Sequence, residues 1–362
     1  MNIKVIFAAA LGMVALSFAA CSDDESGILP GPPDYMLEEK PTKGAYILTL
    51  HGNDSIWGQH ANQVYVDLSD TLQQPILSRS WHLGFYCGNP ARVTLNQSLS
   101  RVYPTGKTEF AAVSEADATV EGFPDLAGGM MSFPQDIAIT DATDGDLEKT
   151  MFGDLSTNAA ESEVFLLGEE EMYTVDWYKV KITALPEGYQ MEYGRINDTT
   201  PKQVTIEKDA ARTFVAFSLQ SGKIVEVPDH WDLMWAKSIA LTTMPNGKQI
   251  LGPSSDVITS NRVGGVEVAQ VMVVNPKEIR KEFENFAKAD VANLEFTKNA
   301  DLLGTDWRLS PMPNAVAPGP KSDRFYVFKD AEDNYFKLRF LHFCEADGGV
   351  RGEPVLEAAP LN

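Results

Sequence analysis

The stretch "HWDLMWAK" (230–237) decides the fold of this chain. In an extended strand, successive side chains point to opposite faces. This stretch therefore predicts both of its tryptophans and Leu233 on one face, with Asp232 and Met234 on the other. A one-sided set of large apolar side chains is typical of a sheet core, or of a pocket wall that holds something flat and apolar. A similar stretch, "SWHLGFYC", occupies residues 80–87.

The composition limits the class of protein. The chain has 362 residues, 44% of them hydrophobic and 10% aromatic, which indicates a folded protein of about two domains. Its net charge is −21, and no Lys/Arg-rich cluster is present. Nucleic-acid binding requires a basic surface, so this class of function is excluded.

The first residues indicate export and a lipid anchor. Residues 1–20 combine a basic start, an apolar run and small residues, which predicts a signal peptide. The small residues before Cys21 resemble a bacterial lipoprotein signal, in which this cysteine is lipidated. The alternative is a simple signal peptide followed by a chance cysteine. Residues 21–43 are acidic and then rich in Pro and Gly, which predicts a tether. We expect an outer-membrane protein that faces the cell exterior and touches the membrane only through its anchor.

From Gly44 onward the pattern predicts a mainly β fold. Short runs with alternating apolar and polar residues are separated by Gly, Pro, Asn and Asp, which is typical of antiparallel strands. One or two short helices are expected in the second half of the chain. The best candidate spans 275–290, where Asn275 can cap the helix and Pro276 suits its first turn.

Self-comparison indicates an internal duplication. The order "VYVDL" then "SWHLGFYC" in the first half parallels "VAFSL" then "HWDLMWAK" in the second. Later, "WYKVKITAL" parallels "YFKLRFLHF". We therefore expect two similar antiparallel β-sheet domains, 44–198 and 199–362.

The same residues resemble a known family. "FSLQSGKIVEVPDHWDLMWAKS", "SNRVGGV", "GTDWRL" and "YFKLRFLHFCEADGGVRGEP" resemble the HmuY family of surface haem-binding lipoproteins. The resemblance covers most of 201–362 and extends, more weakly, over 44–198. It implies an all-β fold and a protein that takes haem from host proteins. It also implies delivery of that haem to a TonB-dependent outer-membrane receptor.

The resemblance points to particular ligand positions. In the founding member a histidine that binds haem iron lies five residues after the tryptophan of the "WD" strand. That position is Ala236 in the second copy, which cannot bind iron, and Tyr86 in the first, which can. Some relatives use methionines instead.

These considerations give six candidate ligand-binding residues. His82 and Tyr86 share a strand face with Gly84, which leaves room for a ligand; the alternative is an outward-facing histidine and a packed tyrosine. Adjacent methionines in a Gly-rich loop, and the "WD" strand, supply the others: Met130, Met131, Met234 and Trp235. Methionine is also a common filler of irregular core gaps.

Other functions remain as alternatives. A non-haem binding lipoprotein on the same scaffold would take a corrinoid, a glycan or a protein partner. The common motifs of catalytic serine, zinc and nucleotide sites are missing, so we expect no enzyme. Cys87 and Cys344 remain after Cys21 and can form one disulfide only if the fold brings them together.

Overall fold

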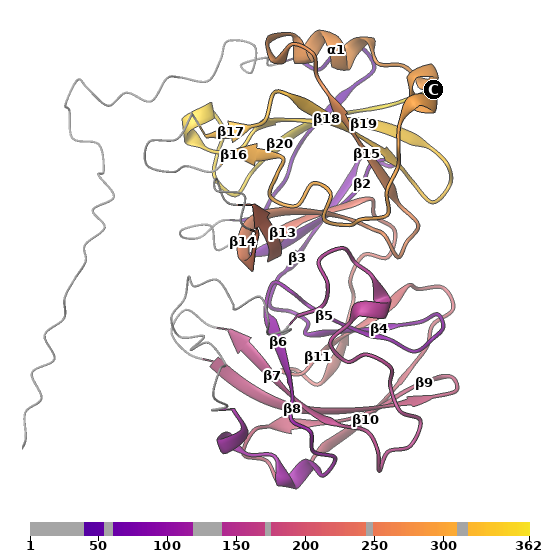
Figure 1. Cartoon of the computed structure of the whole chain (residues 1–362), viewed down its shortest axis with the longest axis vertical. Coiled ribbons are helices and arrows are strands. Elements are labelled where there is room, and N and C mark those ends of the chain that lie inside the picture. The colour runs from indigo at the N-terminus through magenta and orange to yellow at the C-terminus, as the bar shows by residue number, and fades with distance from the viewer. Residues whose placement is uncertain (1–39, 54–60, 119–139, 171–174, 244–248, 310–317) are drawn as a thin grey trace, which may run out of the picture.

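The computed structural model describes residues 40–53, 61–118, 140–170, 175–243, 249–309 and 318–362. Figure 1 shows two halves stacked along the long axis of the molecule. Each half contains a five-stranded outer sheet and a four-stranded inner sheet, and the two inner sheets face the middle of the molecule. The predicted mainly β, antiparallel fold is confirmed.

The upper half contains two main sheets, a small ribbon and the α-helix. In spatial order, its outer sheet contains β1 (Tyr46–Thr49), β20 (Val355–Pro360), β19 (Tyr335–His342), β18 (Arg324–Lys329) and β15 (Glu267–Met272). Its inner sheet contains β14 (Gln249–Ser260), β13 (Leu233–Thr243), β2 (Asn62–Asp67) and β3 (Leu72–Leu77). The ribbon and helix are β16 (Arg308–Leu309), β17 (Gly319–Pro320) and α1 (Ile279–Asn285).

As far as the described residues show, the lower half repeats this plan without a ribbon or an α-helix. Its outer sheet contains β10 (Lys202–Glu207), β9 (Gly188–Arg195), β8 (Val175–Leu185), β7 (Val164–Glu170) and β6 (Ser100–Pro104). Its inner sheet contains β12 (Lys223–Val225), β11 (Phe214–Ser218), β4 (Leu83–Tyr86) and β5 (Val93–Leu95).

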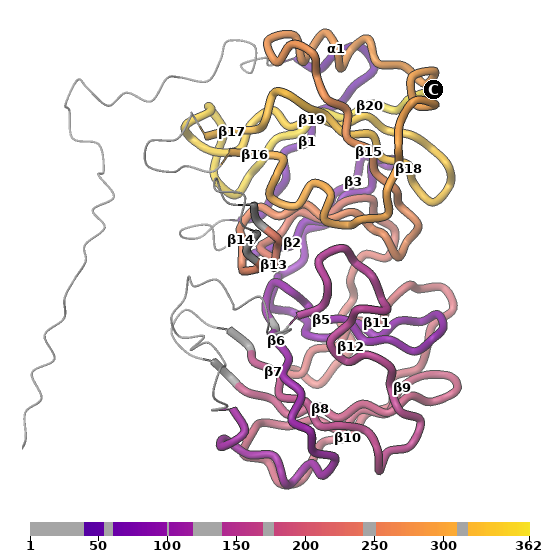
Figure 2. The backbone as a smooth tube through the Cα atoms, viewed as in Figure 1, coloured from indigo at the N-terminus to yellow at the C-terminus, as the bar shows by residue number. Residues whose placement is uncertain are grey.

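The chain exchanges strands between the halves. Figure 2 shows β1, β2 and β3 from the start of the chain in the upper half, among strands from its end. In return, β10, β11 and β12 lie in the lower half with β4 to β9. The predicted division into 44–198 and 199–362 therefore does not coincide with the sheets, because β10 pairs with β9 across it. Alternation predicts which face of a strand is buried, and it does not identify the neighbouring strand.

The exchanged strands meet their partners in the same register in both halves. In the upper inner sheet Val64 pairs with Trp235, and in the lower one Val215 pairs with Phe85. These pairs occupy matching positions of the two sequence copies. A one-residue slip would turn every buried side chain outward, so the shared register gives both sheets a core face and an opposite face of the same pattern.

Matching side chains fix the start of β4 and of β13. The carboxylate Oδ2 of Asp232 accepts the backbone N–H of Leu68 at 2.8 Å. At the matching place Nδ1 of His82 accepts the backbone N–H of Leu219 at 3.2 Å. Each bond ties the exchanged strand to the start of its partner, and so both satisfy a buried backbone donor.

A buried lysine stabilises the matching turn of each half. Nζ of Lys337, on β19, donates to the carbonyl oxygens of Glu284 and Phe286 at 3.2 and 2.8 Å, where α1 ends. On β8, Nζ of Lys179 donates to the carbonyl oxygens of Phe110 and Val113 at 3.2 and 3.0 Å. Carbonyl oxygens near a helix end keep hydrogen-bonding capacity that the helix does not use, and the lysines supply donors to them.

Each half has its own hydrophobic core between its outer and inner sheets. Leu233 and Trp235 are fully buried in the upper core, whereas Leu83 and Phe85 are buried in the lower one. The face of each inner sheet that does not contact its core therefore points toward the other inner sheet.

The predicted helix is present but shorter than expected. Asn275 caps the preceding 3₁₀ turn by accepting the N–H of Lys277, and α1 ends at Asn285. Ile279 and Phe283 are its buried residues. Within the described part of the chain, α1 and every other helix are too short to cross a membrane.

Candidate binding cleft between the two inner sheets

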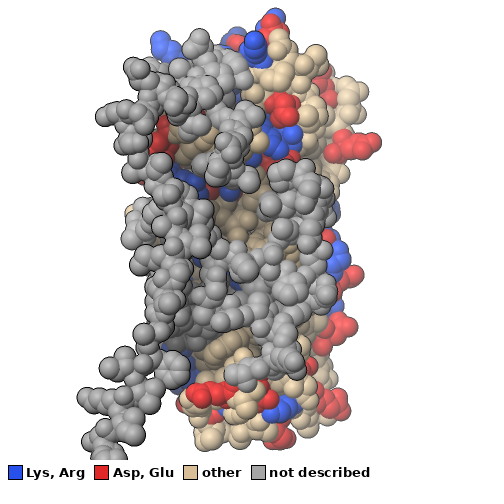
Figure 3. Space-filling model, turned by 60° about the vertical axis from the view of Figure 1, so that its left-hand side comes forward, with Lys and Arg blue, Asp and Glu red and all other residues tan. Residues whose placement is uncertain are grey.

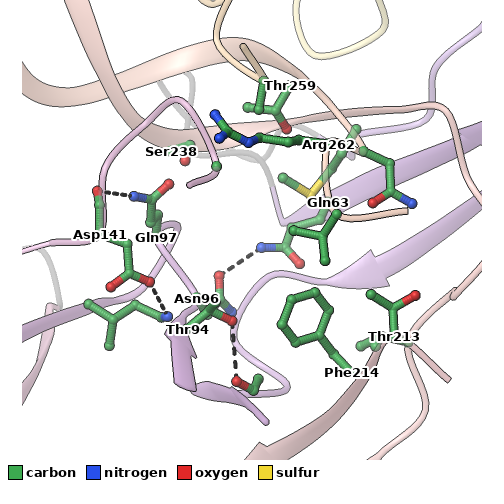
Figure 4. A pocket seen from close by; sticks show the side chains of 18 of the residues that line it. Gln63, Thr94, Asn96, Gln97, Asp141, Thr213, Phe214, Ser238, Thr259 and Arg262 are labelled. Carbon is green, nitrogen blue, oxygen red and sulfur yellow. Dashed lines mark hydrogen bonds between the residues drawn. The ribbon is translucent and has the colours of Figure 1, made fainter. Parts of the chain in front are cut away.

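A cleft lies between the facing inner sheets, where the two halves meet. Its cavity volume is about 200 Å³, below the roughly 300–1,000 Å³ that is typical of pockets for drug-sized ligands. Figure 4 shows Ser238, Thr259 and Arg262 from the upper half on one side and Asn96 and Gln97 from the lower half opposite them.

Aromatic side chains and one methionine give the cleft its apolar wall. Trp81 and Phe214 contribute from the lower half, and Trp231, Tyr65 and Met234 from the upper half. The rings of Tyr65 and Trp231 pack edge to face, with centroids 5.3 Å apart. Rings held in this way present a preformed surface to a flat apolar ligand.

A buried amide network holds two of these rings in place. Oε1 of Gln63 accepts the hydroxyl of Tyr65 at 3.0 Å and Nε1–H of Trp81 at 3.1 Å. Its Nε2 donates to Oδ1 of Asn96 at 2.7 Å and to Oγ of Ser98 at 2.8 Å. Because Gln63 lies in the upper half and the other partners except Tyr65 lie in the lower half, the network also fixes the halves against each other.

A loop of the lower half contacts the upper half beside the cleft. The carbonyl oxygen of Asp144 accepts the N–H of Ala300 and Nη1–H of Arg262, both at 3.1 Å. Arg262 also forms an ion pair with Asp146 at 3.4 Å. The loop begins at Asp141, whose buried carboxylate accepts two backbone N–H groups, from Leu95 at 2.7 Å and Met151 at 2.8 Å. Burial nevertheless raises the pKa of Asp141 to about 6.

The prediction that Trp231 shares a face with Leu233 and Trp235 is wrong. Leu233 and Trp235 lie in the upper core, whereas Trp231 lines the cleft with Met234. The reason is that β13 begins only at Leu233, so the strand alternation does not extend back to Trp231.

Of the four predicted ligand-binding residues that the structure describes, it brings one into the cleft, namely Met234. Tyr86 is half-buried beside it and packs on Phe214, a cleft residue, with centroids 5.6 Å apart. Trp235 is fully buried away from the cleft, with its ring against Gly52. Ala236, at the second family ligand position, is also fully buried.

His82 is neither a cleft residue nor the outward-facing histidine that the sequence suggested. Its side chain is fully buried, and its ring packs edge to face on Tyr178 with centroids 5.5 Å apart. Since Nδ1 accepts the N–H of Leu219, the ring has a structural partner already.

Met130 and Met131 lie outside the described residues, so their role stays a prediction. Cys87 packs against the lower core and Cys344 lies in the upper core, and both are free thiols.

The part of the surface that can be seen in Figure 3 is mixed in charge. On the face shown in Figure 3, Asp and Glu side chains are interspersed with Lys and Arg. Across the residues that the structure describes, no group of three or more His, Cys, Asp or Glu is arranged to hold a metal ion. No histidine is among the described residues that line the cleft.

Sequence reasoning missed the polar half of the cleft. Gln63, Asn96 and Gln97 were not identified, because single amides have no spacing that marks a site. A usable signal was present at Asn96 and Asn261, which follow the matching strands. Their side chains donate to the carbonyl oxygens of Trp81 and Trp231 at 2.8 and 3.0 Å.

Comparison with known proteins gives one match. A family model described as "HmuY protein" matches residues 59–357, which include both halves and the cleft. No curated protein and no solved structure matches the chain.

Proposed function

The chain belongs to the HmuY family, and on this premise we propose that it is a surface lipoprotein that binds haem or a related tetrapyrrole in the cleft between its inner sheets. The observation that carries the proposal is the aromatic wall of Trp81, Phe214 and Trp231 around Met234. A macrocycle needs flat apolar contacts and one or two axial ligands, and these residue types supply both.

The fit of the described residues to a haem group is limited but specific. Met234 offers a thioether to iron, and Tyr86 offers a phenolate at the family ligand position of the first copy. Met130 and Met131 are further candidates. The cavity of about 200 Å³ is small for a whole macrocycle, so one edge of the ring system would enter while the rest stays outside. When bound, haem would supply the iron and the spectroscopic signal, and the chain would supply binding and orientation.

The rest of the proposal concerns location and transfer. We propose that Cys21 carries the lipid anchor, that residues 21–43 form the tether, and that the protein faces the cell exterior. Host haem-carrying proteins would supply the cargo, and a TonB-dependent outer-membrane receptor would take it. This role is one of binding and transfer, with no catalytic step.

A haemin titration tests the proposal. Protein lacking residues 1–21 is titrated with haemin, under oxidising and reducing conditions, while the Soret band is recorded. A saturable shift is expected. Met234→Ala should bind haemin with lower affinity, because the iron loses a thioether ligand. In Tyr86→Phe the wavelength of the Soret band should change if the phenolate is the second ligand.

Met272→Ala is the matched control, because Met272 is exposed on the edge strand β15 of the upper outer sheet. It should bind haemin as the unchanged protein does. The double variant Met130→Ala/Met131→Ala tests the remaining candidates. Absence of a saturable Soret shift in both redox conditions would contradict a haem-binding function.

The alternative is a non-haem ligand, and the amide network favours it. Gln63, Asn96 and Gln97 give the cleft several neutral hydrogen-bonding groups and no histidine among its described residues. Such groups suit a corrinoid side chain, a glycan or a peptide from a protein partner. Calorimetric titration with cobalamin, a ligand that carries amide groups around its ring, tests the first of these.

A further inference from the structure

The two inner sheets present matching rows of side chains to the cleft. In the lower sheet, Gly84 on β4 is paired with Ala216 on β11 and with Thr94 on β5. In the upper sheet, Met234 on β13 is paired with Tyr65 on β2 and with Thr259 on β14. All six residues line the cleft, and the shared register makes each residue of one row the counterpart of one in the other.

The two rows differ most at their two central positions. The upper row carries the large side chains of Met234 and Tyr65, whereas the lower row has Gly84 and Ala216 at the matching positions. The cleft therefore results from a difference between the two copies, because the lower row has no large side chains at the positions that Met234 and Tyr65 occupy in the upper row. Gly84 and Ala216 both line the cavity, and neither carries a large side chain there.

The strand backbone at Gly84 carries no side chain and is bordered by two aromatic rings and by the Thr94 hydroxyl. A Cβ placed on Gly84 would lie 3.6 Å from Cδ1 of Phe214 and 3.7 Å from Cζ3 of Trp81. It would also lie 2.7 Å from Oγ1 of Thr94. Bare strand backbone between two aromatic edges admits a flat group and excludes a branched one.

Met234 and Tyr65 give the upper side of the cleft an apolar part beside its polar residues. The thioether of Met234 is polarisable and makes favourable contacts with aromatic rings. The ring of Tyr65 is fixed by its hydroxyl bond to Gln63 and by its contact with Trp231. A flat ring lying on the floor would thus meet a preformed apolar surface on its second face.

We infer that Gly84 and Ala216 form the floor of a subsite for a single flat conjugated ring, held against Met234 and Tyr65. This inference deepens the proposed function and rests on it in one respect, namely that the ring belongs to a tetrapyrrole. In that case one pyrrole edge enters the subsite. Binding there depends on the flatness of the ring and does not depend on iron.

The test fills the subsite with the side chains that the chain itself uses in the other half. Ala216→Tyr and Gly84→Met place the counterpart residues on the floor. The probes are haemin, followed by its Soret band, and iron-free protoporphyrin IX, followed by fluorescence anisotropy. Both variants should lose affinity for both probes by about tenfold or more, because the ring is excluded from its place.

Met234→Ala separates the subsite from iron binding. This variant should weaken haemin binding more than protoporphyrin binding, because haemin loses an axial ligand and an apolar contact, whereas protoporphyrin loses only the contact. Circular dichroism establishes that each variant is folded. If Ala216→Tyr or Gly84→Met does not fold, Gly84→Ala replaces it, since its Cβ displaces only the Thr94 hydroxyl, and a weaker loss of the same sign is expected.

The outcomes distinguish the two ideas. If Ala216→Tyr and Gly84→Met are folded and bind both probes normally, the subsite inference is overturned and the proposed function stays intact. If the unchanged protein binds neither probe, the proposed function fails. The subsite is then tested with 8-anilinonaphthalene-1-sulfonate, whose emission should rise with the unchanged protein and not with Ala216→Tyr. An equal rise in both would overturn the inference.

Discussion

Asp232 offers the sharpest test of how the exchanged strands are joined. Its carboxylate is buried where β13 begins, and it accepts the N–H of Leu68 from the exchanged segment. Burial, with the charges of Asp67, Asp330 and Glu332, raises its pKa from 3.8 to about 7, although the Leu68 bond acts in the opposite direction. The folded protein therefore holds this proton more tightly than the unfolded chain does.

The sign of the pH effect follows from this shift. The contribution of Asp232 to stability is fully present below about pH 4 and is lost as the pH rises through about 7. One pKa unit corresponds to about 1.4 kcal/mol, so this group should lower the free energy of unfolding by about 2–3 kcal/mol between pH 5 and pH 8. In Asp232→Asn the amide oxygen can still accept the Leu68 N–H, and this loss should disappear.

Urea unfolding of protein lacking residues 1–21, at pH 5 and at pH 8, measures the effect. Asp141 and Asp301, whose pKa values burial raises to about 6, also affect the unchanged protein, so the relevant quantity is the difference between it and Asp232→Asn. Asp70→Asn is the control, because Asp70 is exposed in the turn after β2. If Asp232→Asn keeps the same pH dependence as the control, the reasoning about this buried carboxylate is refuted.

Two further predictions concern matching features of the two halves, and a third concerns the cysteines. Lys337→Met should lower the free energy of unfolding by about 2–5 kcal/mol in urea titrations, because buried backbone carbonyls lose their donor. Lys179→Met should lower it by a similar amount. An unchanged free energy of unfolding in either variant would contradict the account. His82→Asp introduces the counterpart residue of the upper half, where a carboxylate accepts the matching backbone N–H, so it should lower the free energy of unfolding by less than about 1.5 kcal/mol. His82→Ala, which removes the acceptor, should lower it by about 1–3 kcal/mol. Thiol titration of denatured protein lacking residues 1–21 should find Cys87 and Cys344 both free, and a disulfide-linked tryptic peptide pair would contradict the separate cores.

Local features were predictable from the sequence. The alternation of apolar residues in "LGF" (83–85) and "LMW" (233–235) indicated the core face of β4 and β13, where Phe85 and Trp235 are buried. It failed at Trp81 and Trp231, which precede the strands and line the cleft. Asn275 and Pro276 marked the start of the helical segment, because capping depends on residues next to one another.

The partners of these strands were not predictable in the same way. The self-comparison aligned the copies correctly at Leu83 and Leu233, yet it carried no information on which copy supplies the neighbouring strand. That choice depends on long-range pairing, and both arrangements bury the same faces. The cleft shares this origin, because it is lined by both Gly84 and Met234, which belong to the inner sheets of different halves.

Crystals of the protein lacking residues 1–21, soaked with haemin, give the most direct test of the central claim that cargo binds between the two inner sheets. An anomalous difference map at the iron absorption edge locates the metal independently of any side chain. The account predicts one iron peak at the cleft, beside the Met234 thioether. A peak at another place on the molecule, or none at saturating haemin, would contradict it.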